Sequence, residues 1–292
     1  MPPDPPASGK SPAPGNSASH SQEEAPRAAI RPRPKLAVYK FSSCDGCQLS
    51  LLNLEDELLD LVGAVEVAYF LEARRQVQPP PYDVGLVEGS ISTPEEEDRI
   101  RQVRRDCRML VTIGACATSG GIQALRNWAD VGDYVAAVYA QPKYIHTLET
   151  ATPIASHVFV DFELRGCPVN HGQLSELVSA LLVGRKPNIP THSLCVECKR
   201  RGCACLLVAH GEPCLGPITQ AGCGALCPAA GRACYGCFGP MEQPNILSLG
   251  SRFLADGRSA REVKRALRQF NGYLEPFKQG SDHYERLEQG KH

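Results

Sequence analysis

The chain has 292 residues, enough for one full domain and a smaller one. Its 31 basic and 32 acidic side chains give a net charge of −1, and only 6% of its residues are aromatic. Neither a basic surface nor a base-stacking platform is indicated, which argues against nucleic-acid binding. No run of about 18 apolar residues occurs, so no membrane span is predicted.

Residues 1–34 are rich in proline, alanine and serine, a composition that predicts a disordered tail. This segment has no apolar core of a secretory signal and no twin-arginine signal. We therefore expect a cytoplasmic protein, in which structural disulfides are rare.

Residues 35–188 alternate short apolar runs with helical patterns, which predicts a parallel α/β domain covered on both faces. Thr93 and Pro94 have the residue types of a helix N-cap and first position. The predicted strands are residues 35–41, 65–70, 82–87, 109–113 and 158–162, and further helices are predicted at residues 50–62 and 174–183.

Four cysteines follow these predicted strands. Cys44 and Cys47 come after the first strand, Cys116 after the fourth and Cys167 after the fifth. All four are expected in loops at the carboxyl ends of parallel strands, the edge at which open α/β sheets bind ligands. They would form a four-cysteine site there. Cys107, at the end of the charged helix, is expected to be a partly buried free thiol.

Residues 189–245 contain nine of the fourteen cysteines. So dense a segment cannot bury enough apolar surface by itself, and its paired Cys-x2-Cys spacings favour metal over disulfides. Eight thiolates would supply two four-iron clusters, and zinc is the alternative. The nine are Cys195, Cys198, Cys203, Cys205, Cys214, Cys223, Cys227, Cys234 and Cys237.

Residues 246–292 form a C-terminal helical tail with one clear helix signal, which begins at Ser259. Val263, Leu267 and Phe270 make a single apolar stripe, which we expect to dock on this chain or on a partner.

Several motifs resemble the small, electron-transferring subunit of nickel–iron hydrogenases. They include Cys44-Asp-Gly-Cys47, Gly114-Ala-Cys116, Gly166-Cys167-Pro168 and Cys234-Tyr-Gly-Cys-Phe-Gly-Pro240, and they occur in the family's order. The resemblance covers roughly residues 35–245. It is strongest to the cytoplasmic branch, which includes the bidirectional NADP-linked enzymes, or sulfhydrogenases.

The resemblance implies a flavodoxin-like domain at residues 35–188, followed by a small iron–sulfur domain at residues 189–245. It also implies three 4Fe-4S clusters, with cysteine at position 227 where the membrane-bound branch has proline. The implied ligands are Cys44, Cys47, Cys116 and Cys167 for the proximal cluster, Cys223, Cys227, Cys234 and Cys237 for the medial cluster, and Cys195, Cys198, Cys205 and Cys214 for the distal cluster.

Three residues leave alternatives open. Cys203 could replace Cys205 as a distal ligand, and His192 could be either a loop histidine or a stray ligand. Glu88 follows a predicted strand and could relay protons, contact the partner or the proximal cluster, or cap the following turn.

By this resemblance, the chain carries electrons between the nickel–iron centre of a large subunit and a flavin/NAD(P)-binding subunit, with a further iron–sulfur subunit in the complex. The nickel–iron centre and the flavin would lie only in these partners. The alternatives are a related subunit of another hydrogenase or quinone oxidoreductase complex, and a zinc-binding structural protein.

Overall fold

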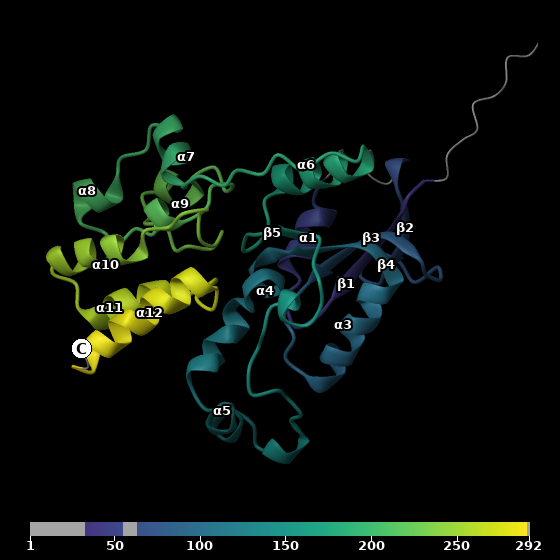
Figure 1. The fold of residues 1–292 in the computed structure, drawn as a ribbon, viewed down its shortest axis with the longest axis horizontal. Coiled ribbons are helices and arrows are strands. Elements are labelled where there is room, and N and C mark those ends of the chain that lie inside the picture. The colour runs from purple at the N-terminus through teal and green to yellow at the C-terminus, as the bar shows by residue number, and fades with distance from the viewer. Residues whose placement is uncertain (1–32, 55–62, 291–292) are drawn as a thin grey trace, which may run out of the picture. The chain divides into compact units, whose positions relative to one another are not determined.

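A five-stranded parallel sheet in the order β2-β1-β3-β4-β5 organises the first half of the structure (Figure 1). The structure, a computed structural model, describes residues 33–54 and 63–290. This strand order is that of flavodoxin-like folds. The strands are β1 (Lys35–Lys40), β2 (Glu66–Phe70), β3 (Tyr82–Glu88), β4 (Cys107–Ile113) and β5 (Phe162–Leu164).

Helices cover both faces of the sheet, as the buried apolar strands require. Leu36 and Val38 of β1 face one side, where they share a core with helices α1 (Gly46–Leu52) and α6 (His171–Leu182). Tyr39 faces the other side, where α3 (Pro94–Asp106) packs. Figure 1 shows α6 and α3 on opposite sides of the sheet.

The helix starts follow local capping chemistry. Thr93 forms a capping box with Glu96, and Pro94 occupies the first helical position, as predicted. Asn170 caps α6 by accepting a hydrogen bond from Gln173 N at 3.1 Å, so this helix begins three residues earlier than predicted. Cys107 is the first residue of β4, not the end of the helix, and it is buried.

The fifth strand was placed wrongly by the sequence pattern, because β5 covers Phe162–Leu164 and not residues 158–162. Asp161 Oδ2 accepts the backbone N–H of Leu110 at 2.8 Å. The Asp161 side chain therefore binds the Leu110 amide, while the Asp161 N–H donates to the Leu110 carbonyl at 2.9 Å, and the regular strand register begins with Val111 opposite Phe162.

Short helices connect the remaining parts. Between β4 and β5 they are α4 (Gly114–Ser119), η1 (Gly121–Trp128), α5 (Val131–Val138), η2 (Pro142–Tyr144) and η3 (Ile154–Ser156). The cysteine-rich segment contains α7 (Cys195–Arg200), α8 (Leu206–His210), η4 (Gly216–Ile218) and α9 (Leu226–Ala229). No helix in the described ranges is long and apolar enough to cross a membrane.

Three helices follow the cysteine-rich segment, where the sequence indicated one. They are α10 (Ile246–Ala255), α11 (Ala260–Leu267) and α12 (Glu275–Glu288). Val263 and Leu267 of α11 share a hydrophobic core with Cys214 and Cys234, so the tail docks on this chain. The predicted domain boundaries at 188/189 and 245/246 stay predictions. The predicted tail at residues 1–34 and the second half of the helix at 50–62 fall almost wholly outside the described residues.

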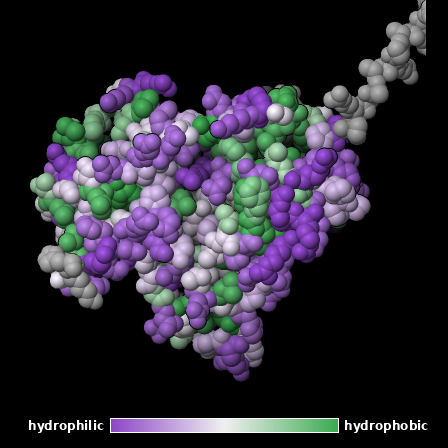
Figure 2. All heavy atoms as spheres, viewed as in Figure 1, coloured by the Kyte–Doolittle hydropathy of each residue, from purple (hydrophilic) through white to green (hydrophobic). Residues whose placement is uncertain are grey.

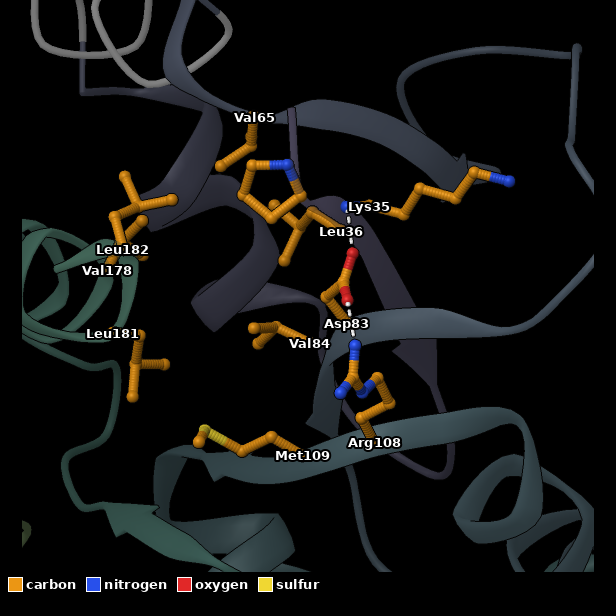
Figure 3. Close-up of a pocket in the computed structure, with 11 residues that line it drawn as sticks. Lys35, Leu36, Val65, Asp83, Val84, Arg108, Met109, Val178, Leu181 and Leu182 are labelled. Atoms are coloured by element: carbon orange, nitrogen blue, oxygen red, sulfur yellow. Dashed lines mark hydrogen bonds and ion pairs between the residues drawn. The ribbon is translucent and has the colours of Figure 1, made fainter. Parts of the chain in front are cut away.

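A cavity of about 300 Å³ opens at the amino ends of β1, β3 and β4 (Figure 3). Val84, Met109 and Leu181 line it, and Asp83 at its rim accepts the backbone N–H of Lys35 at 2.9 Å. The strands are parallel, so this cavity lies at the edge of the sheet opposite the cysteines, which follow the strands' carboxyl ends.

Candidate functional site

Four cysteines and one buried carboxyl group lie at or just after the carboxyl ends of four strands. Cys44 and Cys47 come after β1, Glu88 ends β3, Cys116 follows β4, and Cys167 follows β5. The chain order reverses between β1 and β3, which makes this edge a topological switch point. The prediction that all four lie in loops was wrong for two of them, because Cys47 and Cys116 lie in the first turns of α1 and α4.

Glu88 positions the first of these helices. Its side chain is 1% exposed, and it accepts the backbone N–H groups of Cys47 at 3.1 Å and Gln48 at 3.0 Å. A helix start has free N–H groups, and a carboxyl group can bind them from outside the helix. Burial raises the pKa of Glu88, and these two hydrogen bonds oppose that rise. Glu88 therefore caps α1, not the turn that follows β3.

The thiols at this edge lie within electrostatic range of one another. Burial raises the pKa of Cys116 to about 12, and negative charge on Cys167 and Cys44 would raise it further. Burial also raises the pKa of Cys47 and of Cys167. Metal ligation requires thiolates, so a metal bound here would displace their protons.

Gly114 leaves space for the Cys47 sulfur. Its φ is +86°, and a Cβ at this position would collide with Cys47 Sγ. Only glycine combines this backbone conformation with so close an approach.

The Gly114→Ala variant is therefore expected to lose the proximal cluster and about four irons per chain. Iron analysis and EPR of the anaerobically purified protein would measure the loss. Gly63→Ala is the matched control, because none of the described residues lies within 4 Å of a Cβ at Gly63. A Gly114→Ala protein with full iron content would contradict the steric argument.

A second group of thiols lies in the carboxyl-terminal part of the cysteine-rich segment. Burial raises the pKa of Cys237 to about 12, and negative charge on Cys223 and Cys227 contributes. Burial raises the pKa of Cys234 as well, and the N–H of Gly236 donates to its sulfur at 3.4 Å. These four cysteines are the set expected to bind the medial cluster.

The third group contains the five remaining cysteines of the segment. A small cavity of about 30 Å³ is lined by the four expected distal ligands, Cys195, Cys198, Cys205 and Cys214. Cys203 is absent from the residues that line it. Its backbone N–H donates to the carbonyl of Cys198 at 3.1 Å, and negative charge on Cys203 would raise the pKa of Cys198. This arrangement favours Cys205 as the ligand and Cys203 as its neighbour.

Replacing each of these two cysteines tests the choice. Cys205→Ala is expected to lose about four irons per chain, because one cluster would lack a ligand. Cys203→Ala is expected to keep about twelve. Iron and acid-labile sulfide counts on the two purified variants would compare them, and the reverse pattern would make Cys203 the ligand.

Close approaches connect the three groups in sequence. A Cβ at Gly166, next to Cys167 of the first group, would lie 3.2 Å from the ring of Phe238, next to Cys237 of the second. The backbone N–H of Cys234 in the second group donates to Cys214 Sγ of the third at 3.3 Å. The second group therefore has a neighbour in each of the other two.

The sequence did not reveal two polar residues that contact these cysteine groups, because neither belongs to a recognisable motif. Gln123 Oε1 accepts the Cys116 thiol at 3.3 Å, while its Nε2 donates to Ser42 O at 2.9 Å. Asn271 Nδ2 donates to the carbonyls of Gly236 at 3.0 Å and Cys237 at 2.9 Å. Isolated amides give no periodic or spacing signal. His192 Nδ1 lies 3.1 Å from the carbonyl oxygen of Ser193, a contact that suits a loop histidine.

The donor set can be compared with two kinds of metal site. In the described ranges, no three His, Cys, Asp or Glu side chains lie close enough to hold one metal ion. A four-iron cluster makes a different demand, because each of its four cysteines binds a separate iron atom. Three groups of four thiols, with glycines that admit close backbone approach, fit clusters of this kind.

Comparison with known proteins gives consistent matches. The family model described as NADH ubiquinone oxidoreductase, 20 Kd subunit, matches residues 44–181. Sulfhydrogenase 2 subunit delta of Pyrococcus furiosus is 34% identical over 233 residues, which are 79% of this chain and 98% of that protein. NAD-reducing hydrogenase HoxS subunit delta of Cupriavidus necator is 26% identical over 172 residues, which are 54% of this chain and 82% of that protein.

A solved structure has a similar fold over about half of this chain. The crystal structure of an NAD+-reducing NiFe-hydrogenase in the hydrogen-reduced state contains a chain 29% identical to this one, with a TM-score of 0.50. The match covers 54% of this chain and 96% of that chain. Sequence and fold therefore agree, and this chain belongs to the family of hydrogenase subunits that includes sulfhydrogenase subunit delta.

Proposed function

We propose that this chain is the iron–sulfur electron-transfer subunit of a cytoplasmic nickel–iron hydrogenase. It would carry three 4Fe-4S clusters, held by the proximal, medial and distal cysteine sets named above. The observation that carries this proposal is the packing of Gly166, next to Cys167, against Phe238, next to Cys237, together with the hydrogen bond from Cys234 to Cys214. It supports a route with the medial site between the other two.

Each cluster, when bound, would accept and release one electron with little change in geometry. The chain's residues hold the sites and adjust their surroundings. Glu88 holds the amides that start α1 and so positions Cys47. Gln123 accepts the Cys116 thiol, and Asn271 holds the loop that contains Cys237. A proton relay through Glu88, or a contact of Glu88 with the partner, stays a hypothesis.

The reaction with hydrogen would take place at a nickel–iron centre in a separate large subunit, against the proximal edge. A flavin/NAD(P)-binding subunit and a further iron–sulfur subunit would receive the electrons. The similarity to a subunit of an NAD-reducing hydrogenase supports a nicotinamide-linked complex of this kind. NADP is the nicotinamide that we propose, from the resemblance to the bidirectional NADP-linked enzymes.

A subunit of a quinone oxidoreductase complex is the second candidate, because the matching family model carries that description. That match ends at residue 181, before Cys195. The match to sulfhydrogenase 2 subunit delta spans 98% of that protein and extends over 233 residues. The cysteine-rich segment therefore favours the hydrogenase role.

Anaerobic purification of the chain with its co-expressed partners tests the proposal. About twelve irons per chain with matching acid-labile sulfide, and hydrogen-dependent reduction of a viologen dye, are expected. Stoichiometric zinc without sulfide would instead identify a zinc-binding structural protein. Full iron content without any hydrogen-dependent activity in the complex would favour the quinone oxidoreductase.

A further inference from the structure

One buried side chain beside the medial cysteines carries a hydrogen-bond donor without a partner. Gln173 lies in the first turn of α6 and is 8% exposed, and its buried Nε2 makes no hydrogen bond to any of the described residues. The polar residues His171 and Ser179 of the same helix are exposed instead, and Figure 2 shows hydrophilic side chains on the surface over α6. An unpaired buried donor costs free energy, so its position needs a physical reason.

The unpaired amide lies against the loop that carries the first medial cysteine. A Cβ at Gly222 would collide with Gln173 Nε2 and would lie 2.8 Å from Gln173 Oε1, so the amide occupies the space that a side chain at position 222 would take. Gly222 immediately precedes Cys223, and its φ is +146°. Glycine therefore lets the amide approach the backbone beside a medial ligand.

The backbone of Gln173 is fixed by its neighbours along the chain. Asn170 Oδ1 accepts the Gln173 N–H at 3.1 Å, and Leu174 is buried in the core that α6 shares with the sheet. Cys167, an expected proximal ligand, precedes Asn170 by three residues. The amide therefore extends from a well-packed helix start, which follows a proximal ligand, to the medial loop.

We propose that the Gln173 side-chain amide donates a hydrogen bond to a sulfur atom of the medial cluster and raises the reduction potential of that cluster. This inference rests on the proposed function and adds a positioning residue to one of its three sites. A thiolate-bound cluster is anionic and gains negative charge when it is reduced, so a donor to its sulfur stabilises the reduced form more than the oxidised form. Hydrogen bonds to sulfur are among the factors that set the potentials of such clusters.

Two simpler roles would also use this amide, namely binding a buried water molecule or packing against Gly222. In either case, removal of the donor would leave the potential of the medial cluster unchanged, even if the chain became less stable. The reduction potential therefore separates the proposed role from a purely structural one.

The experiment compares two substitutions in the purified hydrogenase complex. Gln173→Met removes the donor and keeps an unbranched side chain of similar length. Gln220→Met is the matched control, because Gln220 lies three residues before Cys223 and its Nε2 already donates to the carbonyl of Pro190 at 2.8 Å. Iron content is measured first, and the potential of the medial cluster is then determined by redox titration followed by EPR. The medial signal is the one that Cys223→Ala lacks.

Both methionine variants are expected to keep about twelve irons per chain. Gln173→Met should weaken reduction of the medial cluster about tenfold, which is a fall of about 59 mV in its potential for a one-electron couple. Gln220→Met should keep the potential of the parent. Equal potentials in the parent and Gln173→Met, or equal shifts in the two variants, would overturn the proposal.

If Gln173→Met lost iron, the Gln220→Met complex would decide, because it retains Gln173. When its glutamine side-chain amides are labelled with ¹⁵N, the reduced medial cluster should show a ¹⁵N coupling in ENDOR spectra, and absence of that coupling would overturn the proposal. A parent complex without iron or without hydrogen-dependent dye reduction would count against the proposed function. Normal iron content and dye reduction, with no shift in potential in Gln173→Met, would count only against the role of Gln173.

Discussion

Substituting Cys116 by alanine is expected to abolish hydrogen-dependent dye reduction and to remove about four irons per chain. Cys116 lies in the first turn of α4, directly after β4, and its thiol donates to Gln123. Loss of one thiolate leaves an iron without its protein ligand, and the sheet edge loses what the metal contributes to folding. Iron analysis and the dye assay on the purified complex would measure both effects.

Cys107→Ala is the matched control, because Cys107 begins the strand that precedes Cys116. Cys107 is buried at the opposite end of β4, about 20 Å from its carboxyl end at a rise of about 3.3 Å per residue. A Cβ at Gly85 would lie 2.5 Å from its sulfur, so it fills space between β3 and β4. Its substitution should keep the iron content and nearly all activity. Equal activity in the two variants would remove the basis for the proximal site.

Truncation of Phe277 to alanine is expected to lower the free energy of unfolding by about 3–5 kcal/mol. Phe277 is 1% exposed in the core that joins α10, α11 and α12 to the cysteine-rich segment. A Cβ at Gly236 would lie 3.4 Å from its ring, so the ring supports the loop between Cys234 and Cys237. Denaturant titration of the full-length chain would measure the change.

Leu247→Ala provides the comparison for that measurement. Leu247 lies in α10 but is 50% exposed, and exposed substitutions usually change stability by less than about 0.5 kcal/mol. Equal unfolding midpoints for the two variants would mean that the tail helices do not stabilise the cysteine-rich segment.

The sequence predicted the sheet well because its signals are local. β1 and β4 are apolar runs with cysteines after their carboxyl ends, and Thr93 and Glu96 form the predicted helix cap by short-range hydrogen bonds. The parallel order then follows from alternating strands and helices. The placement of four cysteines after these strands could therefore be predicted before any contact was known.

The sequence-based predictions of strands and helices failed where tertiary packing, or a side chain that bonds to a backbone amide, determines the local structure. Val158 and Val160 look like a strand, yet they pack at the margin of the core, and Asp161 binds the Leu110 amide. The helix α12 contains Gly280, a poor helix former, and a Cβ there would collide with Ile246. Such a helix is stabilised by its fit against α10, which a pattern of single residues does not reveal.

The hydrogen bond from the Cys234 amide to Cys214 Sγ has a mechanical consequence. One peptide group takes part in two neighbouring binding loops, because Cys234 belongs to one thiol group and Cys214 to the next. Both residues are buried in the same hydrophobic core. A displacement of either loop is therefore transmitted to the other through this 3.3 Å hydrogen bond. Damage to one of the two loops is therefore expected to displace the other, so the two binding sites would lose their geometry together.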